Sequence, residues 1–307
     1  MPAIEVQDLR KAYGATRAVD GITFAVHGGE VFGMLGPNGA GKTTTTEIIE
    51  GLREADSGEV RVLGLDVRRQ RQQVKRRIGV QLQTTALYPR LTVREVLDLF
   101  ATFFPGEKRS TDTLIEVVNL GEKQKTLSKD LSGGQRQRLS VALALINKPE
   151  VVFLDEPTTG LDPQARRNMW ETVRQVRQTG ATVFLTTHYM EEAETLCDRV
   201  AVVDAGKIIA LNTPSALIQE HFKETAIDFE LQGELPPEGT FRNLKGVTRP
   251  AVREGQRVTI YTDNAVGTLG GLTDLAESGA IRFDALQVRR ATMEDVFLKL
   301  TGKRIRE

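Results

Sequence analysis

The sequence predicts an α/β fold with a mainly parallel sheet, followed by a small α+β domain. Short apolar runs rich in β-branched residues alternate with segments of helical periodicity, which is typical of a parallel sheet covered by helices. Several of these runs are apolar throughout, as strands buried on both faces are. From about residue 225 onward apolar and polar residues alternate instead, which indicates half-buried strands.

The elements are expected in the following order. In the first part, strands are predicted at 31–35, 78–82, 151–154, 182–186 and 199–203, and helices at 42–52, 92–104, 135–146, 163–178 and 189–197. The region from about 84 to 147 holds helical patterns and no clear strand, so we expect a helical insertion between two core strands. We place the first domain at 1–222 and the second at 223–307. The second has strands at 226–233, 256–262 and 281–288, turns at 234–239 and 248–256, and one or two helices.

The composition and charge of the chain argue against several classes of protein. Lys and Arg number 41, as do Asp and Glu, so the net charge is zero; a chain that binds nucleic acid mainly through phosphates would carry a basic excess. The single cysteine, Cys197, excludes an internal disulfide framework. The N-terminus lacks a secretory signal pattern and no stretch reaches the roughly 18 apolar residues of a membrane span. For the basic run at 68–77, a solvated helix is favoured over a patch for nucleic acid or acidic lipid.

The stretch GPNGAGKT (36–43) fits the pattern G-x-x-x-x-G-K-[ST] and lies between an apolar strand and a helix, the context that this motif requires. Its glycines let successive backbone N–H groups point at phosphate oxygens, and the helix start adds its positive dipole end. Lys42 can reach the β- and γ-phosphates, and the Thr43 hydroxyl can ligate Mg²⁺. The sequence therefore predicts a nucleotide-binding site at this loop, which the family resemblance below makes a site for ATP. The candidate residues are Gly36, Asn38, Gly39, Ala40, Gly41, Lys42, Thr43 and Thr44.

Two further motifs complete the candidate site. VVFLDEP ends an apolar strand with Asp155 and Glu156, where open parallel sheets place their ligands. Asp155 can hold Mg²⁺, and Glu156 can polarise a water toward the γ-phosphate. LSGGQ (131–135) opens a helix at Ser132, a residue suited to the N-cap, and two glycines bare the N–H groups of the first turn. We interpret it as a second anion-binding surface made by Ser132, Gly133, Gly134 and Gln135.

Together these motifs resemble the ATP-binding subunits of ABC transporters over about residues 3–220. The match is specific because seven motifs occur in the family order. The resemblance implies N-terminal antiparallel strands before the P-loop core. It makes GPNGAGKT the Walker A loop, VVFLDE the Walker B strand with Glu156 as catalytic base, and LSGGQ the family signature. It also implies that Tyr13 stacks on adenine, that Gln83 of the Q-loop senses the γ-phosphate and contributes to the metal site, that Asp162 lies in the D-loop and that His188 is the switch histidine.

The resemblance further implies an assembly. Two such subunits pack head to tail, with each ATP between the Walker A loop of one and the LSGGQ of the other, and an intact motif set permits a homodimer. A groove beside the Q-loop, walled by residues 86–100, receives a helix of an integral membrane permease, which places the subunit at the cytoplasmic face of the membrane. The tail ATMEDVFLKLTG (291–302) is similar to that of exporters of drugs, antibiotics and ions.

Other classes fit less well. ABC-type ATPases that act on ribosomes usually carry two cassettes, and this chain has one. Those that act on DNA carry long coiled-coil insertions, for which the span from Walker A to LSGGQ is too short. A small-molecule kinase with a P-loop would not explain LSGGQ. We therefore expect an ATPase that drives export, and no nucleic-acid partner.

Overall fold

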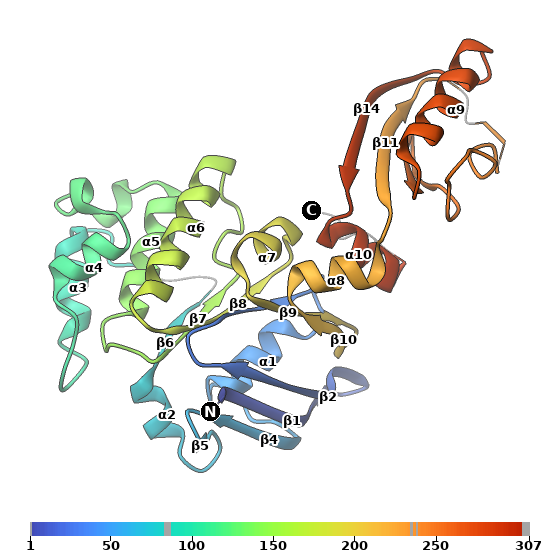
Figure 1. Ribbon diagram of the computed structural model, residues 1–307. Coiled ribbons are helices and arrows are strands. Elements are labelled where there is room, and N and C mark those ends of the chain that lie inside the picture. Colours follow the sequence, from blue (N-terminus) through green and yellow to red (C-terminus); the bar gives the residue numbers. More distant parts are fainter. Residues whose placement is uncertain (1, 83–86, 234–235, 238, 303–307) are drawn as a thin grey trace. The chain divides into compact units, whose positions relative to one another are not determined.

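The computed structural model describes residues 2–82, 87–233, 236–237 and 239–302 (Figure 1). The chain divides into two compact units, the first ending at Pro214 and the second beginning at Ser215, and each unit has a hydrophobic core of its own. The sequence predicts the boundary after residue 222. Helix α8 (Pro214–His221), which that prediction includes in the first domain, belongs to the second unit from Ser215 onward.

The first unit contains two sheets. The antiparallel sheet has the order β2-β1-β4-β5, and the larger sheet has the order β10-β9-β3-β8-β7-β6, in which only β10 pairs in the antiparallel sense. The strands of the first sheet are β1 (Pro2–Tyr13), β2 (Thr16–His27), β4 (Ser57–Val62) and β5 (Leu65–Asp66); those of the second are β3 (Val31–Leu35), β6 (Ile78–Gln81), β7 (Val151–Asp155), β8 (Thr182–Thr187), β9 (Arg199–Asp204) and β10 (Lys207–Asn212). The mainly parallel sheet and the N-terminal antiparallel strands are both confirmed.

The parallel register positions the candidate site. Leu35 pairs with Thr187 and Asp155 pairs with Thr186, so β3, β7 and β8 end at the same edge of the sheet. All residues of these three strands are buried, which accounts for their continuous apolar pattern. The loops that follow them, although distant in sequence, must therefore meet at this edge.

One core fills the space between the two sheets. Helix α1 (Lys42–Ile49) packs against β2 and β4 of the antiparallel sheet and against β7 and β8 of the parallel one. A row of phenylalanine rings runs through this core: Phe24 lies 5.3 Å from Phe32, Phe32 lies 5.6 Å from Phe184, and Phe184 lies 5.5 Å from Phe153, measured between ring centroids. Stacked and tilted rings at such distances add about 0.5–1.5 kcal/mol per pair beyond their area burial. The row fixes the strand whose end starts the phosphate loop.

The remaining helices of the first unit are α2 (Arg71–Arg77), α3 (Val93–Ala101), α4 (Thr111–Val117), α5 (Gly133–Ala144), α6 (Pro163–Gln178) and α7 (Met190–Leu196). Between residues 87 and 147 the structure has helices and no named strand, as the helical insertion requires. Residues 71–77 of the basic run form α2, in which only Val74 is buried. In the described part of the chain no helix is both long and apolar enough to span a membrane.

The second unit is an antiparallel sheet with helices. Its strands β11 (Thr225–Leu231), β12 (Val252–Glu254), β13 (Arg257–Thr262) and β14 (Phe283–Arg290) lie in the order β12-β13-β11-β14, with α9 (Ala265–Glu277) and α10 (Met293–Thr301). The turn predicted at 248–256 is wrong in part, because 252–254 form β12, which pairs with β13 across a tight hairpin at Gly255 (φ 58°). Half of the turn predicted at 234–239, namely residues 234, 235 and 238, lies outside the described residues.

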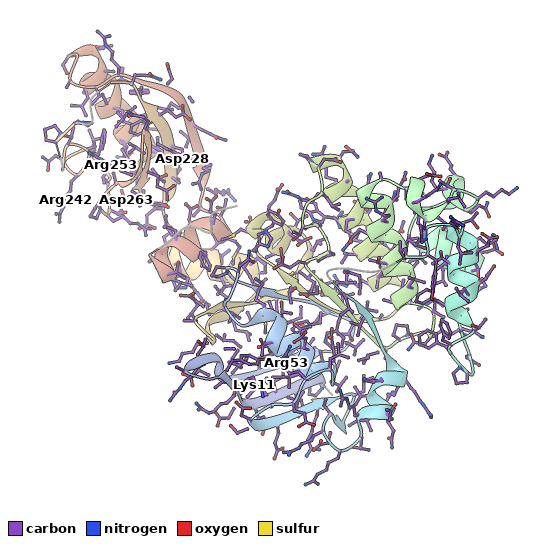
Figure 2. The ribbon with its side chains drawn as sticks, turned by 180° about the vertical axis from the view of Figure 1, so that it is seen from behind. Lys11, Arg53, Asp228, Arg242, Arg253 and Asp263 are labelled. Carbon is purple, nitrogen blue, oxygen red and sulfur yellow. The ribbon has the colours of Figure 1, made fainter. Side chains whose placement is uncertain are left out.

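A buried ionic network joins α10 to this sheet. The Arg289 guanidinium donates to Asp228 on β11 (Nε to Oδ2, 2.7 Å) and to Asp295 on α10 (Nη1 to Oδ2, 2.5 Å). The Tyr261 hydroxyl donates to Asp295 at 2.6 Å. Asp228, which Figure 2 labels, and Asp295 are both buried. The tail motif ATMEDVF therefore carries a residue, Asp295, that anchors its helix.

Candidate nucleotide site

The phosphate loop follows β3 and ends where α1 begins at Lys42. The N-cap Gly41 has φ 99° and no side-chain cap, so the first N–H groups of α1 keep no local acceptor. Gly41 is sterically required, because a Cβ there would lie 2.1 Å from the Ala18 carbonyl oxygen. The Gly36 N–H donates to the Thr187 carbonyl at 3.2 Å, which ties the loop to the end of β8. The result is an anion-binding helix start held at the sheet edge.

The four threonines of α1 divide into two pairs. The hydroxyls of Thr45 and Thr46 donate to the Gly41 and Lys42 carbonyl oxygens, at 2.8 and 3.0 Å, and both residues are buried. The hydroxyls of Thr43 and Thr44 make no hydrogen bond within the described residues, and both line an open cavity. Only this second pair is available to a ligand.

That cavity, of about 400 Å³, collects most of the predicted phosphate-loop residues. It is lined by Tyr13, Ala18, Asn38, Gly39, Gly41, Lys42, Thr43, Thr44 and Glu156. Its volume falls in the range of small-ligand sites. Gly36 and Ala40 do not line it: the Gly36 carbonyl accepts from Lys42, and Ala40 is buried. Ala18 was missed by sequence reasoning, and nothing in the sequence near it signals the role, because β2 brings it there.

Lys42 and Glu156 meet at the bottom of this cavity. The Lys42 Nζ atom lies 3.3 Å from Glu156 Oε1 and donates to the carbonyl oxygens of Gly36 (2.8 Å) and Pro37 (3.2 Å). Burial lowers the pKa of Lys42, and the charge of Glu156 opposes that shift. Burial raises the pKa of Glu156, but the charges of Lys42 and His188 outweigh it, so that this pKa lies below its ordinary value. Glu156 is thus held ionised, as a general base must be.

The backbone of Glu156 is in the left-handed region, with φ 45°, which costs a non-glycine residue on the order of 1–3 kcal/mol. Its N–H donates to the Thr186 hydroxyl at 3.0 Å, and its Oε2 atom accepts from the Thr159 hydroxyl at 3.1 Å. These contacts compensate the strained turn and aim the carboxylate into the cavity. The sequence does not reveal Thr159 or Thr186 as partners, because either could be an ordinary polar residue at a strand end.

Asp155 and Thr43 supply the oxygen atoms that a magnesium ion would use. The Asp155 Oδ1 atom accepts from the Thr186 hydroxyl at 2.5 Å, and its other oxygen makes no hydrogen bond within the described residues. Burial raises the pKa of Asp155, while the bond from Thr186 and the charge of Lys42 lower it. A carboxylate and a free hydroxyl are hard oxygen ligands of the kind Mg²⁺ takes. Gln83, the third predicted ligand, lies outside the described residues.

His188 lies beside Glu156, at the end of β8. Its Nδ1 atom is 3.3 Å from Glu156 Oε2 but has no aligned hydrogen bond. The ring also contacts that of Tyr189, at 4.2 Å between centroids. The structure thus brings the predicted switch position to the predicted base.

Tyr13 lies at the mouth of the cavity and is 43% exposed. Two cations flank its ring, with Lys11 Nζ at 5.7 Å and Arg53 Cζ at 5.4 Å from the centroid; Figure 2 labels both. Arg53 also pairs with Glu47 at 2.6 Å. A half-exposed ring held by two cations offers a face on which a base could stack.

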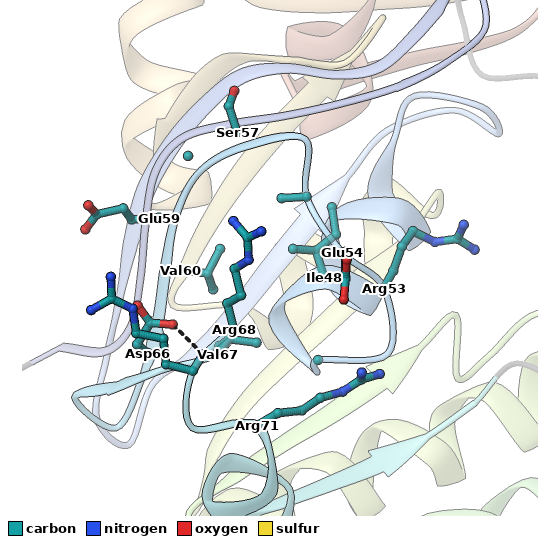
Figure 3. A pocket seen from close by; sticks show the side chains of 14 residues that line it. Ile48, Arg53, Glu54, Ser57, Glu59, Val60, Asp66, Val67, Arg68 and Arg71 are labelled. Atoms are coloured by element: carbon teal, nitrogen blue, oxygen red, sulfur yellow. Dashed lines mark hydrogen bonds between the residues drawn. The ribbon is translucent and has the colours of Figure 1, made fainter.

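Arg53 also lines a separate cavity of about 430 Å³ between the end of α1 and the β4–β5 region (Figure 3). Figure 3 shows Arg68, Arg71 and Asp66 around it. The Asp66 carboxylate accepts from the backbone N–H of Arg69 at 2.9 Å. None of the predicted phosphate-loop or acidic residues lines this cavity. It is therefore distinct from the candidate nucleotide site.

The LSGGQ segment starts α5, away from the phosphate-loop cavity. Ser132 is the N-cap, its hydroxyl accepting from the Gln135 N–H at 3.3 Å, while Gln135 Oε1 accepts from the Ser132 N–H at 3.0 Å. Asp162 caps α6 by accepting from the N–H groups of Gln164 and Ala165, both at 2.9 Å. Gly134 allows a close approach of α5 and α6, because a Cβ there would lie 2.9 Å from Ala165. Ser132, Gly133, Gly134, Gln135 and Asp162 do not line the cavity of Lys42.

Comparison with known proteins decides the family. The linearmycin resistance ATP-binding protein LnrL of Bacillus subtilis is 37% identical over 311 residues, which cover 99% of this chain and 100% of that protein. This chain belongs to the ATP-binding proteins of ABC transporters. The family model described as "ABC transporter" matches residues 19–159. As an ABC ATP-binding protein the chain binds and hydrolyses ATP.

Other relatives and solved structures belong to the same family. The daunorubicin resistance ATP-binding protein DrrA3 of Streptomyces coeruleorubidus is 41% identical, with 99% of this chain and 98% of that protein covered, and the Nod factor export ATP-binding protein I of Rhizobium meliloti is 41% identical, with 99% and 90% covered. A solved ATP-binding subunit of an ABC transporter is 29% identical with a TM-score of 0.63, covering 71% of this chain and 93% of that one. The structure of cbiO1 from Clostridium perfringens is 25% identical with a TM-score of 0.65, covering 72% and 92%.

Proposed function

We propose that this ABC ATP-binding protein drives the export of a drug, an antibiotic, a lipid-like molecule or an ion through a separate integral membrane permease. Export is supported by its relatives, which serve resistance to linearmycin and daunorubicin and the export of Nod factor. The observation that carries the mechanism is the single cavity shared by Tyr13, the phosphate loop, Lys42 and Glu156. A nucleotide there would have its base, phosphates and attacking water each beside a suitable group.

The residues of the cavity would divide the work as follows. Tyr13 stacks on adenine, and the N–H groups from Asn38 to Thr44, with Lys42, hold the phosphates. Glu156, which its lowered pKa keeps ionised, accepts a proton from the attacking water. His188 lies at the same carboxylate and would contact the γ-phosphate.

Magnesium would be held by Thr43 and Asp155, and by Gln83 as the third predicted ligand. When bound, the ion neutralises charge on the β- and γ-phosphate oxygens. Asp155 keeps an oxygen free for this purpose, while its other oxygen is oriented by Thr186. Burial of Asp155 and of Lys42 keeps the electrostatic interactions in the site strong.

The active assembly would be a head-to-tail homodimer. The Ser132 helix start is a second anion-binding surface, and it does not line the cavity of its own chain. A second copy would place its Ser132, Gly133, Gly134 and Gln135 over the phosphates, with its Asp162 nearby. ATP would then join the two copies by charge, and release of phosphate after hydrolysis would let them separate.

A permease would dock on the helical insertion. The Phe100 ring contacts those of Tyr88 and Phe103, at 6.3 and 5.8 Å between centroids. Tyr88 and Phe103 are 51% and 63% exposed. Next to Phe103, Phe104 lines a cavity of about 270 Å³ together with Leu52 and Leu143. Apolar side chains left exposed in this way mark a protein interface. The docking would place the chain at the cytoplasmic face of the membrane. We expect no nucleic-acid partner, because the net charge of the chain is zero.

Crosslinking between copies tests this proposal. We would combine Asn38→Cys and Ser132→Cys with Glu156→Gln, which slows hydrolysis. Cys197 is buried, and burial raises the pKa of its thiol, so it should not compete. We expect a disulfide-linked dimer on a non-reducing gel with ATP and Mg²⁺, but not with ADP or in either single-cysteine variant. A crosslink that forms equally without ATP, or none with it, would contradict the composite site.

A further inference from the structure

Glu192 is a fully buried carboxylate on α7, the short helix that begins just after His188. Its Oε1 atom accepts from the indole N–H of Trp170 on α6, with a donor–acceptor distance of 3.3 Å. Burying a carboxylate costs free energy unless hydrogen bonds or opposite charges stabilise it. None of the roles proposed above uses this residue.

The groups around Glu192 come from three segments that carry the proposed machinery. Trp170 and Arg166 belong to α6, the helix that Asp162 caps. Thr158 belongs to the loop that follows Glu156. Thr187 precedes His188, and because its hydroxyl accepts from the Tyr189 N–H at 2.9 Å, its own proton is free to point to the carboxylate. Arg166 and the Thr158 and Thr187 hydroxyls all favour the ionised form of Glu192.

Buried polar atoms without an aligned hydrogen bond gather at this point. They include Glu192 Oε2, the Thr158 hydroxyl, Arg166 Nε and His188 Nδ1. Native proteins leave few such atoms, and each demands an explanation. Arg166 stacks on Tyr189 at 4.2 Å, and the Tyr189 ring contacts His188, so the cluster is continuous from α6 to the proposed switch histidine. Such a cluster is expected where a segment has two arrangements. In the arrangement seen here these donors and acceptors lie close without bonding, and in the other they would form hydrogen bonds.

We propose that Glu192 is a positioning residue for ATP hydrolysis, whose carboxylate links the loop after Glu156, helix α6 and the segment of His188, so that the three move together when nucleotide binds. This inference rests on the proposed roles of Glu156, His188 and Asp162. Glu192 itself does not line the nucleotide cavity. It acts through the placement of others.

The charge of Glu192 makes the link adjustable. Burial raises the pKa of Glu192 to about 7, while the nearby Thr187 and Thr158 hydroxyls and the hydrogen bond from Trp170 act in the opposite direction. The other charged or titratable groups that interact with it are Arg166 on α6, which stabilises the ionised form, and Cys197 after α7, whose thiol pKa is raised by burial and further by Glu192. Glu192 is therefore ionised above about pH 7 and neutral below it, with a weaker hold on Trp170 and Arg166 in the neutral form.

Trp170 provides a direct readout, because it is the only tryptophan in the chain. We would record its fluorescence from pH 5.5 to 8.5 in the wild type, in Glu192→Gln and in Glu191→Gln, whose exposed side chain on the same helix makes it a matched control. One transition near pH 7 is expected in the wild type and in the control, and none in Glu192→Gln. A transition that persists in Glu192→Gln would overturn the assignment of the titrating group.

Steady-state hydrolysis separates positioning from a merely structural role. Glu192→Gln should lower kcat about ten- to a hundredfold, the penalty of slightly misplaced reacting groups, while KM for ATP stays within about twofold, because a position outside the cavity adds no uniform binding. Glu192→Asp, which keeps the charge but withdraws it from Trp170, should also lower kcat. Wild-type kcat in Glu192→Gln would overturn the proposal.

A second variant guards against misfolding of the first. Thr158→Val removes the hydroxyl that faces the carboxylate and should reproduce the loss of kcat, and the double variant with Glu192→Gln should be no worse than the more impaired single variant, as expected for one linked unit. Independent, additive losses would argue against a shared link. Glu156→Gln keeps the two hypotheses apart: if it retains turnover, the assigned base is wrong, whereas the pH transition of Trp170 depends only on Glu192.

Discussion

Lys42 and Glu156 form a buried ion pair across the nucleotide cavity, with Lys42 Nζ 3.3 Å from Glu156 Oε1. The pair joins the phosphate loop to the end of β7. Lys42 also donates to two carbonyl oxygens of its own loop, those of Gly36 and Pro37. A bound triphosphate would replace these contacts with stronger charge-assisted ones, leaving Glu156 to a water.

Glu156→Gln tests the role of the base. The amide keeps the shape and can still contact Lys42 through its oxygen, but it cannot take a proton. We expect ATP binding to persist and hydrolysis to fall by about 10²–10⁴-fold, the usual contribution of a positioned base. Steady-state phosphate release and size-exclusion chromatography with ATP should show slow turnover and a trapped dimer. Glu59→Gln, on an exposed strand residue, is the control, and turnover near the wild-type rate would reject the assigned base.

Lys42→Ala should weaken ATP binding about ten- to a hundredfold, since hydrogen bonds to charged groups contribute about 1.5–3 kcal/mol. It should also change the pH dependence of the remaining hydrolysis. The charge of Lys42 lowers the pKa of Glu156, so without it the pKa rises, and activity should begin to fall at a higher pH as the pH is lowered. Titration with a fluorescent ATP analogue and a pH–rate profile measure the two effects. Unchanged affinity would count against the phosphate loop.

The phosphate loop could be predicted because its chemistry is contiguous. The spacing from Gly36 to Thr43, the strand before it and the helix after it are all local, and the structure reproduces them. Contacts between distant segments could not be predicted in the same way. Neither the cations that flank Tyr13 nor the division of the threonines into free and bonded pairs has a signal in the sequence, because both depend on how β1, α1 and the loop after it pack.

In the second unit, too, local strands could be predicted but contacts between distant segments could not. Its alternating strands at 226–233, 256–262 and 281–288 were recognisable, whereas β12 was interpreted as part of a turn because Pro250 and Gly255 flank it. The pairing of Arg289 with both Asp228 and Asp295 depends on bringing β14, β11 and α10 together. Such long-range ionic contacts are set by the fold, and the charges themselves look like ordinary surface residues in the sequence.

Tyr13→Ala should weaken ATP more than it weakens inorganic triphosphate, because only ATP has a base to stack. Stacking on an aromatic side chain contributes about 1–3 kcal/mol per base, so the loss should be roughly five- to a hundredfold for ATP. Tyr13→Phe keeps the ring and the cations beside it, and should bind like the wild type. Competition binding measures both ligands; equal losses for ATP and triphosphate would remove the stacking role.

Phe103→Ser should weaken the docking of the permease. The ring is 63% exposed and contacts Phe100 edge-on, so the folded protein loses little packing, while an interface would lose an aromatic anchor worth about 2 kcal/mol or more. Copurification from membranes should recover less of the integral membrane partner, with ATP hydrolysis of the free subunit unchanged. Val266→Ser, at an 82% exposed apolar residue of the second unit, serves as the comparison. Full recovery of the partner with Phe103→Ser would move the docking surface elsewhere.

Asp295→Asn should destabilise the second unit through its buried network. The variant leaves Arg289 with a single carboxylate, and breaking a buried ion pair on one side costs about 3–5 kcal/mol. Burial raises the pKa of Asp295, but the bonds from Arg289 and Tyr261 outweigh it, so the pKa lies below its ordinary value. The stabilisation is therefore present above an unfolded-state pKa of about 3.9 and is lost as the pH falls through the lower folded-state pKa.

Two measurements check the contribution of Asp295. Hydrogen exchange of the β11 and β13 amides should be faster in the variant at pH 7 than in the wild type or in the exposed control Glu277→Gln. Guanidinium unfolding should show that the difference in stability between variant and wild type shrinks below pH 4. Equal protection at pH 7 would mean that the network contributes no net stability, and that α10 is held by its buried apolar residues Met293, Val296 and Phe297 instead.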